Sequence, residues 1–124
     1  MTEVKQTLQQ MCEEFDITPR TLRYYEYIEL LSPQRDGRKR LYGGRERARL
    51  TLILRGRRFG FSLEEIRQWL ALYEIEDNQT TQYREWVEIS TRQIDELESR
   101  KRELEEAIDE LTRLRDVVES ALET

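Results

Sequence analysis

The side chains able to do specific chemistry here are arginine, threonine and tyrosine, because histidine is absent and cysteine occurs once, as Cys12. A zinc site of Cys and His ligands, an intrachain disulfide and a Ser-His or Cys-His catalytic pair all need residues that this chain lacks. We therefore expect no enzyme activity, no metal and no cofactor. Cys12 lies on an apolar stripe with Met11 and Phe15, which predicts a buried, inert thiol, with a redox-sensitive crosslink between two chains as the alternative.

The densest group of hydrogen-bonding side chains is the run RTLRYY at residues 20–25. On a helix, Leu22 and Tyr25 face the same neighbour, which leaves an outer set of Arg20, Thr21, Arg23 and Tyr24. Arginine can grip guanine O6 and N7 or a phosphate, and the hydroxyl groups reach phosphate oxygens or base edges. This outer set is the candidate for reading DNA, and an ordinary exposed helix face is the alternative interpretation.

Two short helices position these residues. Apolar residues at positions 8, 11, 12 and 15 predict a first helix over about Thr7–Glu14. Thr18 is a good N-cap and Pro19 a good first helical residue, so a second helix runs from there to about Ile28. Two helices joined by so short a turn predict a helix-turn-helix, whose second helix enters the major groove.

A short basic hairpin follows this pair. Asp36-Gly37 between short flanks predicts its turn. The hairpin carries four basic residues, Arg35, Arg38, Lys39 and Arg40, which suits a wing that contacts the flanking DNA backbone. The fold class that these elements predict is mainly α, a winged helix-turn-helix with a small β wing.

Charge is distributed unevenly, although the net charge is −5. Residues 15–60 hold 12 Lys and Arg against 5 Asp and Glu, whereas residues 77–124 hold 7 against 14. A basic segment of this size can neutralise several phosphates, while the acidic segment would be repelled from DNA. Taken alone, the basic surplus is equally consistent with a solvated face.

Two more helices complete the predicted head. The third, about Gly44–Arg58, directs Leu50, Ile53 and Leu54 inward and ends in a cluster of Arg55, Arg57 and Arg58. These arginines can hold phosphate, but they also offset the partial negative charge of a helix C-terminus, which is the alternative reading. Ser62 to Glu65 is a capping box that starts a fourth helix, with an apolar face that extends to about Tyr73.

A heptad repeat occupies the last part of the chain. After a linker at about Glu74–Gln82, a helix to Leu122 carries one narrow apolar seam, which a single helix cannot bury. The seam predicts a homodimer and divides the chain into a head at residues 1–77 and a linker and dimerisation helix at 78–124. Its apolar members are Val87, Ile94, Leu97, Leu104, Ile108, Leu111 and Val118.

Three blocks together carry a family resemblance: ITPRTLRYYE at residues 17–26, LLSP at 30–33 with RLY at 40–42, and GFSLEEI at 60–66. In this order and spacing they resemble the MerR family of bacterial transcriptional regulators. Lys39 stands where the family has an aromatic residue, and Gly43 where it usually has a capping Ser or Thr. The subgroup that regulates branched-chain amino acid and acyl-CoA breakdown is the most similar, on the runs RERARL at 45–50 and LRGRR at 54–58.

The resemblance implies DNA contacts at Arg23, Tyr24, Tyr25, Arg40 and Tyr42, with Arg20 and Thr21 setting sequence preference. It further implies an antiparallel dimeric coiled coil, promoter DNA distorted within a pseudopalindromic site, and RNA polymerase as a partner. A small-molecule effector is left open, and Trp69, Tyr73, Tyr83 and Trp86 either line a pocket for it or simply pack.

Two further expectations concern location and function class. No run approaches the length of a membrane span and the first residues lack a secretion-signal pattern, so we expect a cytoplasmic protein without membrane contact. The competing function is a coiled-coil interaction adaptor whose basic head binds an acidic protein. A steep loss of duplex DNA affinity with salt separates the two.

Overall fold

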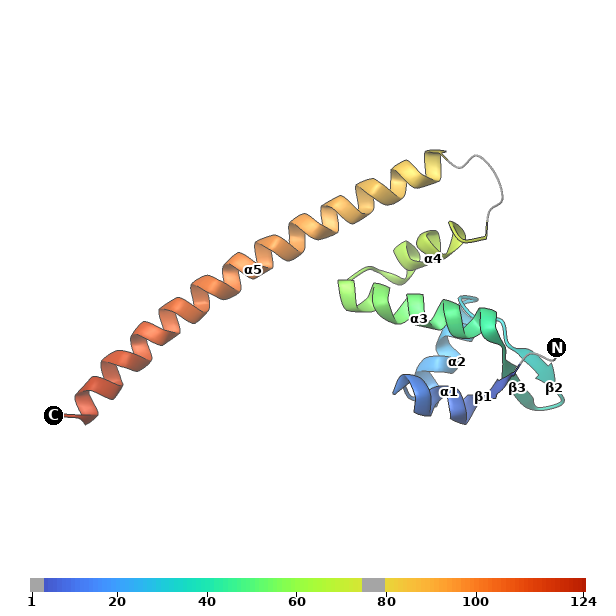
Figure 1. Cartoon of the computed structure of the whole chain (residues 1–124), viewed down its shortest axis with the longest axis horizontal. Helices are drawn as coiled ribbons and strands as arrows, with labels where there is room; N and C mark the ends of the chain where they lie inside the picture. The colour runs from blue at the N-terminus through green and yellow to red at the C-terminus, as the bar shows by residue number, and fades with distance from the viewer. Residues whose placement is uncertain (1–3, 75–79) are drawn as a thin grey trace. The chain divides into compact units, whose positions relative to one another are not determined.

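The computed structural model describes residues 4–74 and 80–124. The chain forms two compact units, Met1–Gln79 and Thr80–Thr124, and we call the described part of the first unit the head. The predicted boundary at residues 77 and 78, and most of the predicted linker, lie outside the described residues. The elements in chain order are β1 (Gln6–Thr7), α1 (Leu8–Phe15), α2 (Pro19–Tyr27), β2 (Gln34–Asp36), β3 (Lys39–Tyr42), α3 (Gly44–Phe59), α4 (Leu63–Ala71) and α5 (Thr80–Leu122) (Figure 1).

The helix-turn-helix is confirmed, with helix ends within one residue of the prediction. Thr7 starts α1 through a capping box, because its Oγ1 accepts a hydrogen bond from the Gln10 amide at 3.2 Å and its amide donates to Gln10 Oε1 at 2.9 Å. Thr18 caps α2 as predicted, since its Oγ1 accepts from the Thr21 amide at 3.1 Å. The Thr7 bonds thus fix where α1 begins, and the Thr18 bond fixes where α2 begins.

The wing is the hairpin β2–β3, and its turn differs by one residue from the prediction. Asp36 pairs with Lys39, so the two turn residues are Gly37 and Arg38. Gly37 has a φ of +63°, which suits the first position of a type II′ turn. A third strand, β1, was not predicted; it pairs antiparallel with β3 but is too short to show an alternating pattern.

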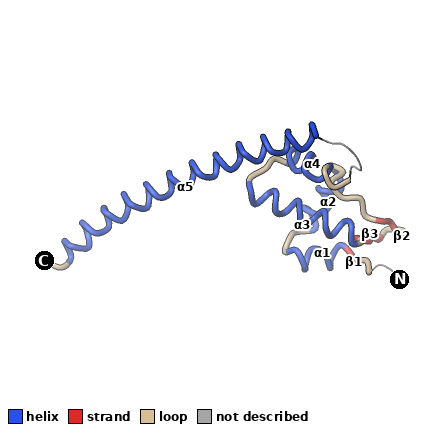
Figure 2. Tube along the Cα trace, turned by 45° about the horizontal axis from the view of Figure 1, so that its top comes forward, coloured by secondary structure: helices blue, strands red, loops and turns tan. Residues whose placement is uncertain are grey.

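The core of the head lies between the four helices and β3. Figures 1 and 2 show the strands together at one end of the head beside α1–α4, where α1 packs on α2 and β3, and α3 packs on α4. Ser62 forms the predicted capping box with Glu65. α4 ends at Ala71 and Tyr73 is exposed, so Tyr73 does not continue the apolar face as predicted. Among the described residues, the fully buried aliphatic side chains are Met11, Leu22, Leu30, Leu31, Leu50, Ile53, Ile66 and Leu70.

Gly56 sets how closely α3 and α4 approach. A Cβ at this position would lie 2.6 Å from Ile66 Cγ1, which is well inside van der Waals contact. We therefore expect Gly56→Ala to destabilise the head by about 1–3 kcal/mol through overpacking. Thermal melting checks this, with Arg55→Ala on the exposed face of the same helix as the control. Equal melting temperatures for the two variants would contradict the close packing.

α5 is a single helix of 43 residues that begins two residues before its predicted start. At 1.5 Å per residue it is about 65 Å long. None of its described side chains is buried within this unit. Its apolar seam is therefore available to another chain.

Candidate nucleic-acid interface

The recognition helix α2 has one packed face and one polar face, as predicted. Leu22 is fully buried and Tyr25 is 6% exposed, whereas Tyr24 is 48% exposed. Arg20 and Arg23 are also exposed. Helical spacing thus brings two guanidinium groups and one phenol to the outside of the helix, where they can reach base edges and phosphates.

Thr21 is half-buried and its hydroxyl is oriented by the N-cap. Thr18 Oγ1 donates a hydrogen bond to Thr21 Oγ1 at 2.9 Å. Because a hydroxyl has one proton and can accept from a neighbour at the same time, the Thr21 proton remains available to donate outward. Thr21 is therefore suited to an acceptor on a base edge or a phosphate.

A shallow hollow beside α2 gathers residues from three parts of the head. The α2 residues that line it are Arg20, Thr21, Tyr24 and Tyr25, and they are joined by Arg57 of α3 and Leu63 of α4. Of the arginine cluster that ends α3, it is Arg57 that lies at this hollow. Arg55 and Arg58, for which DNA contact stays a prediction, are exposed but do not line the hollow.

Tyr25 and Tyr42 are positioned for packing rather than for broad contact with DNA. Burial raises the pKa of the Tyr25 phenol, and burial together with nearby Glu26 raises that of Tyr42 to about 12. Tyr42 is fully buried and its hydroxyl has no hydrogen-bond partner among the described residues. We assign the Tyr42 ring to the core, and the DNA contact that the resemblance implied for its hydroxyl stays a prediction.

The wing is tied to α2 through one carboxylate. Arg40 Nε donates to Glu26 Oε2 at 2.5 Å and Arg35 donates to Glu26 Oε1 at 2.8 Å. The Arg40 side chain is only 23% exposed, so its guanidinium holds the wing against the recognition helix instead of pointing freely outward. Arg38 and Lys39 at the tip of the hairpin are exposed. Arg35 is paired with Glu26, but its side chain is also 51% exposed.

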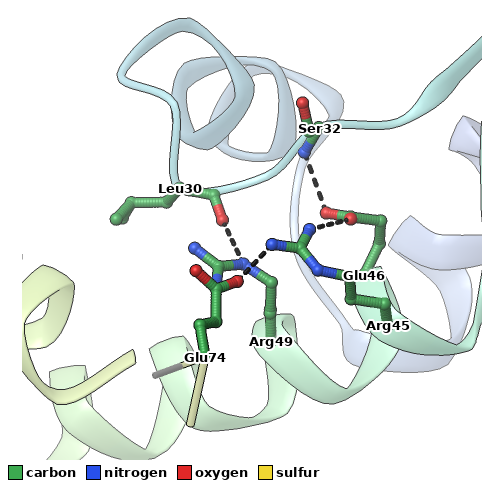
Figure 3. Close-up of polar contacts among 6 residues, drawn as sticks. All are labelled: Leu30, Ser32, Arg45, Glu46, Arg49 and Glu74. Carbon is green, nitrogen blue, oxygen red and sulfur yellow. Dashed lines mark hydrogen bonds and ion pairs between the residues drawn. The ribbon is translucent and has the colours of Figure 1, made fainter. Parts of the chain in front are cut away.

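Glu46 is a buried carboxylate whose structural role was not predicted from the sequence. Its side chain is 7% exposed and accepts hydrogen bonds from the Ser32 amide at 2.8 Å and from Arg45 at 2.7 Å (Figure 3). Ser32 lies in the segment that joins α2 to the wing. The signal in the sequence was an acidic residue in the first turn of α3, but that position equally suits an exposed residue that complements the helix dipole.

Arg49, one turn farther along α3, binds the same connecting segment. Its Nε donates to the Leu30 carbonyl oxygen at 2.9 Å, and its Nη1 donates to Glu74 at 2.7 Å. Arg45 also binds Glu74, so the two arginines share this carboxylate (Figure 3). The position of the α2–wing connection is thus set by charged side chains of α3.

Cys12 is half-buried, whereas the sequence predicted a buried thiol. Burial raises the pKa of its thiol, which disfavours the reactive thiolate. The described residues contain no group of three or more His, Cys, Asp or Glu side chains placed to hold a metal ion. None of the described helices is both long enough and apolar enough to cross a membrane.

The predicted seam of α5 is exposed along its whole length in the single chain. Val87 is 60% exposed near one end and Val118 is 62% exposed near the other. Continuous exposure of large apolar side chains on one helix face marks a surface for a partner. The remaining apolar members, all exposed, are Ile94, Leu97, Leu104, Ile108 and Leu111.

Two family models match the chain over most of its length. The model described as "MerR HTH family regulatory protein" matches residues 7–72, and the one described as "MerR, DNA binding" matches residues 47–114. The first covers the helix-turn-helix, the wing and α4. The second continues through most of α5.

Individual relatives agree with the family models. The chain is 38% identical over 95 residues to the HTH-type transcriptional regulator HmrR of Rhizobium leguminosarum bv. viciae, covering 76% of this chain and 71% of HmrR. It is 35% identical over 103 residues to the HTH-type transcriptional regulator ZntR of Escherichia coli K12, covering 82% and 72%. In fold it is similar to HiNmlR, a MerR family regulator that lacks the sensor domain and was solved bound to promoter DNA, with a TM-score of 0.67, 23% identity and coverage of 86% and 80%.

Proposed function

The chain belongs to the MerR family of DNA-binding transcriptional regulators, and from this premise we propose that it acts as a homodimer that distorts a pseudopalindromic promoter site. The observation that carries the proposal is the polar face of α2, where Arg20, Arg23 and Tyr24 are exposed opposite a packed face. A helix with this arrangement fits the width of the major groove. Double-stranded DNA is the partner of the head.

Within this proposal the two DNA-contacting elements have different tasks. Arg20 and Thr21 on α2 read base edges, whereas Arg23 and Tyr24 bind the backbone beside them. On the wing, Arg38 and Lys39 bind flanking phosphates. Arg40 serves mainly to hold the wing in place, because its guanidinium is already bound by Glu26. The arginines Arg55, Arg57 and Arg58 add positive charge near the end of α3.

The partner of the α5 seam is a second copy of the chain. A heptad seam buries its apolar side chains when two helices pack knobs into holes. Two heads on one dimer then match two half-sites of one DNA site. The coiled coil is thus required to bring both recognition helices onto the same promoter.

Charge in the seam favours an antiparallel pair. Lys101 and Arg115 occupy the same heptad position as Val87 and Ile94. In a parallel in-register dimer each of these cations would face its own copy, which places like charges together in a partly buried layer. In an antiparallel pair each faces a different residue of the partner, so this repulsion is avoided.

A thiol near one end of α5 tests the orientation. We expect Val118→Cys in a Cys12→Ser background to give no disulfide-linked dimer on mild oxidation. Antiparallel helices that overlap along their full length separate the two thiols by about 50 Å. Non-reducing electrophoresis measures the crosslink, and a thiol-reactive dye confirms that the thiols remain accessible. Near-complete crosslinking would show a parallel dimer.

The signal that this regulator receives is proposed from sequence alone. The support is the pair of runs at residues 45–50 and 54–58 that resemble regulators of branched-chain amino acid and acyl-CoA breakdown. We propose that a regulator of such breakdown responds to a small-molecule effector, for which acyl-CoA esters are the first compounds to test, and that RNA polymerase in the cytoplasm is the second partner. In the head, the Trp69 ring packs against the rings of Phe59 and Tyr73, whose centroids lie 6.5 and 6.3 Å away. These contacts favour a packing role for Trp69 over a place in an effector pocket.

Titration of the DNA complex with acyl-CoA esters, with free CoA as the control, tests the effector.

Footprinting of the wild-type dimer on the DNA upstream of its own gene tests the whole proposal. We expect protection of a dyad-symmetric site and an affinity that falls steeply with added salt, because several phosphate counterions are released on binding. Binding without salt dependence or without a dyad would reject the regulator. Tight binding to an acidic protein in its place would favour the adaptor.

A further inference from the structure

Glu74 lies where the head ends and the chain continues toward α5. It is the last described residue before residues 75–79, and α5 begins at Thr80. One oxygen, Oε1, accepts hydrogen bonds from two arginines of α3, Arg45 and Arg49 (Figure 3). The shared carboxylate of Glu74 therefore ties the exit of the chain from the head to α3.

Both arginines are bound at the same time to the connection between α2 and the wing. Arg49 donates to the Leu30 carbonyl oxygen at 2.9 Å, and its side chain is only 14% exposed. Arg45 binds Glu46 at 2.7 Å, and Glu46 accepts from the Ser32 amide at 2.8 Å. Two separate chains of polar contacts thus lead from Glu74 to the backbone on either side of Leu31.

This connection determines how the wing is presented relative to the recognition helix. Leu30 and Leu31 are buried and fix the middle of the segment. Glu29, just before them, has a left-handed φ of 65° in the C-terminal cap of α2, where the Glu29 and Leu30 amides donate to the Glu26 and Tyr25 carbonyl oxygens. Arg67 of α4 also donates to the Ile28 carbonyl oxygen. Side chains of α3 and α4 thus bind the backbone of this bent connection at Ile28, Leu30 and Ser32.

The charges around Glu74 balance only when its carboxylate is present. Arg45 and Arg49 carry two positive charges, and Glu46 and Glu74 carry two negative charges. Without the charge of Glu74, two guanidinium groups one helical turn apart repel each other with one carboxylate between them. Arg45 would keep its bond to Glu46 and Arg49 its bond to the Leu30 carbonyl oxygen, so the repulsion between the two arginines would act on both ends of the connection.

We propose that Glu74 is a positioning residue for DNA recognition, which acts through Arg45 and Arg49 on the α2–wing connection at Leu30–Ser32. A displacement of the chain at Glu74, on the path to α5, is thereby passed to the wing without any contact between Glu74 and DNA. The partner concerned is duplex DNA, so the expected effect on DNA binding rests on the proposed function. The hold of Glu74 on the α2–wing connection does not depend on that function.

The variant Glu74→Gln tests the role with Glu14→Gln as its matched control. Both changes remove one negative charge and the ion pairing that it makes to α3, which is one pair to Arg47 for Glu14 and two pairs, to Arg45 and Arg49, for Glu74. Only Glu74 is joined to arginines that also hold the α2–wing connection. In the full-length protein we expect amide hydrogen exchange at residues 28–42 to quicken by about two- to fivefold in Glu74→Gln and to stay unchanged in Glu14→Gln.

Binding provides the second readout, on a duplex that the wild-type protein selects from a random pool. We expect Glu74→Gln to lower the ratio of selected to scrambled affinity by about two- to fivefold, and Glu14→Gln to leave it unchanged. Equal behaviour of the two variants, or faster exchange throughout the head of Glu74→Gln, would overturn the inference. If the wild-type protein selects no duplex, the proposed function fails, while the exchange experiment still decides whether Glu74 holds the connection.

Discussion

Leu104→Asp is expected to convert the dimer into monomers. Leu104 lies near the middle of the α5 seam and is 64% exposed in the single chain. In the dimer the aspartate would place an unpaired carboxylate among apolar side chains, at a cost of several kcal/mol, and each dimer contains two copies. A weakening of about 4 kcal/mol corresponds to about a thousandfold in the dissociation constant. Sedimentation equilibrium measures this change directly.

A second aspartate separates the effect of the seam from that of charge. Ser99 faces away from the seam by heptad position, so Ser99→Asp adds the same charge without burying it. We expect that variant to remain a dimer and to bind DNA like the wild type. Leu104→Asp should lose most of its affinity for a two-half-site duplex, because each monomer holds one recognition helix. An intact Leu104→Asp dimer would refute the assignment of the seam.

Arg20→Ala and Lys39→Ala are expected to affect DNA binding in different ways. Arg20 on the outer face of α2 meets base edges, so its loss should lower discrimination by about 1–3 kcal/mol at one position of the site. Lys39 on the wing meets phosphates, which are alike in every sequence. Its loss should weaken binding about equally on all duplexes and reduce the salt slope by about one unit.

Binding to the selected site and to scrambled duplex at several salt concentrations distinguishes these outcomes, with melting as the control for folding. Arg40→Ala gives a third pattern. Because Arg40 ties the wing to Glu26 at 2.5 Å, its removal should lower both affinity and discrimination. If Lys39→Ala changed sequence preference and Arg20→Ala changed only the salt slope, the placement of α2 in the groove would be wrong.

Local signals in the sequence predicted the elements of the head because their causes lie within a few residues. Thr18 followed by Pro19 started α2 where expected, and Ser62 with Glu65 started α4. In each case a side chain bonds a backbone amide three positions away, so three or four residues contain all the information needed. The turn of the wing was misplaced by one residue, because Asp36 and Gly37 both suit a turn and only the strand pairing with Lys39 distinguishes them.

The roles of individual polar side chains depended on contacts between distant segments. The basic wing read from the sequence did not reveal that Arg40 binds Glu26 of α2, 14 positions earlier, or that Tyr42 is fully buried. The choice of Arg57 over its neighbours at the hollow beside α2 likewise required the packing of α2, α3 and α4.

The sequence by itself determined the family, the order of the helices and the wing, and the seam, since periodicity, caps and motif blocks are written in neighbouring residues. Only the tertiary structure decided which charges are free to meet DNA and which hold the fold. Glu46 and Glu74 are ordinary acidic residues in the sequence, yet one is buried against Ser32 and the other is shared by Arg45 and Arg49. The physical reason is that the partner of a charged side chain is whichever opposite charge or backbone group folding brings within hydrogen-bond distance, and that distance is unrelated to separation along the chain.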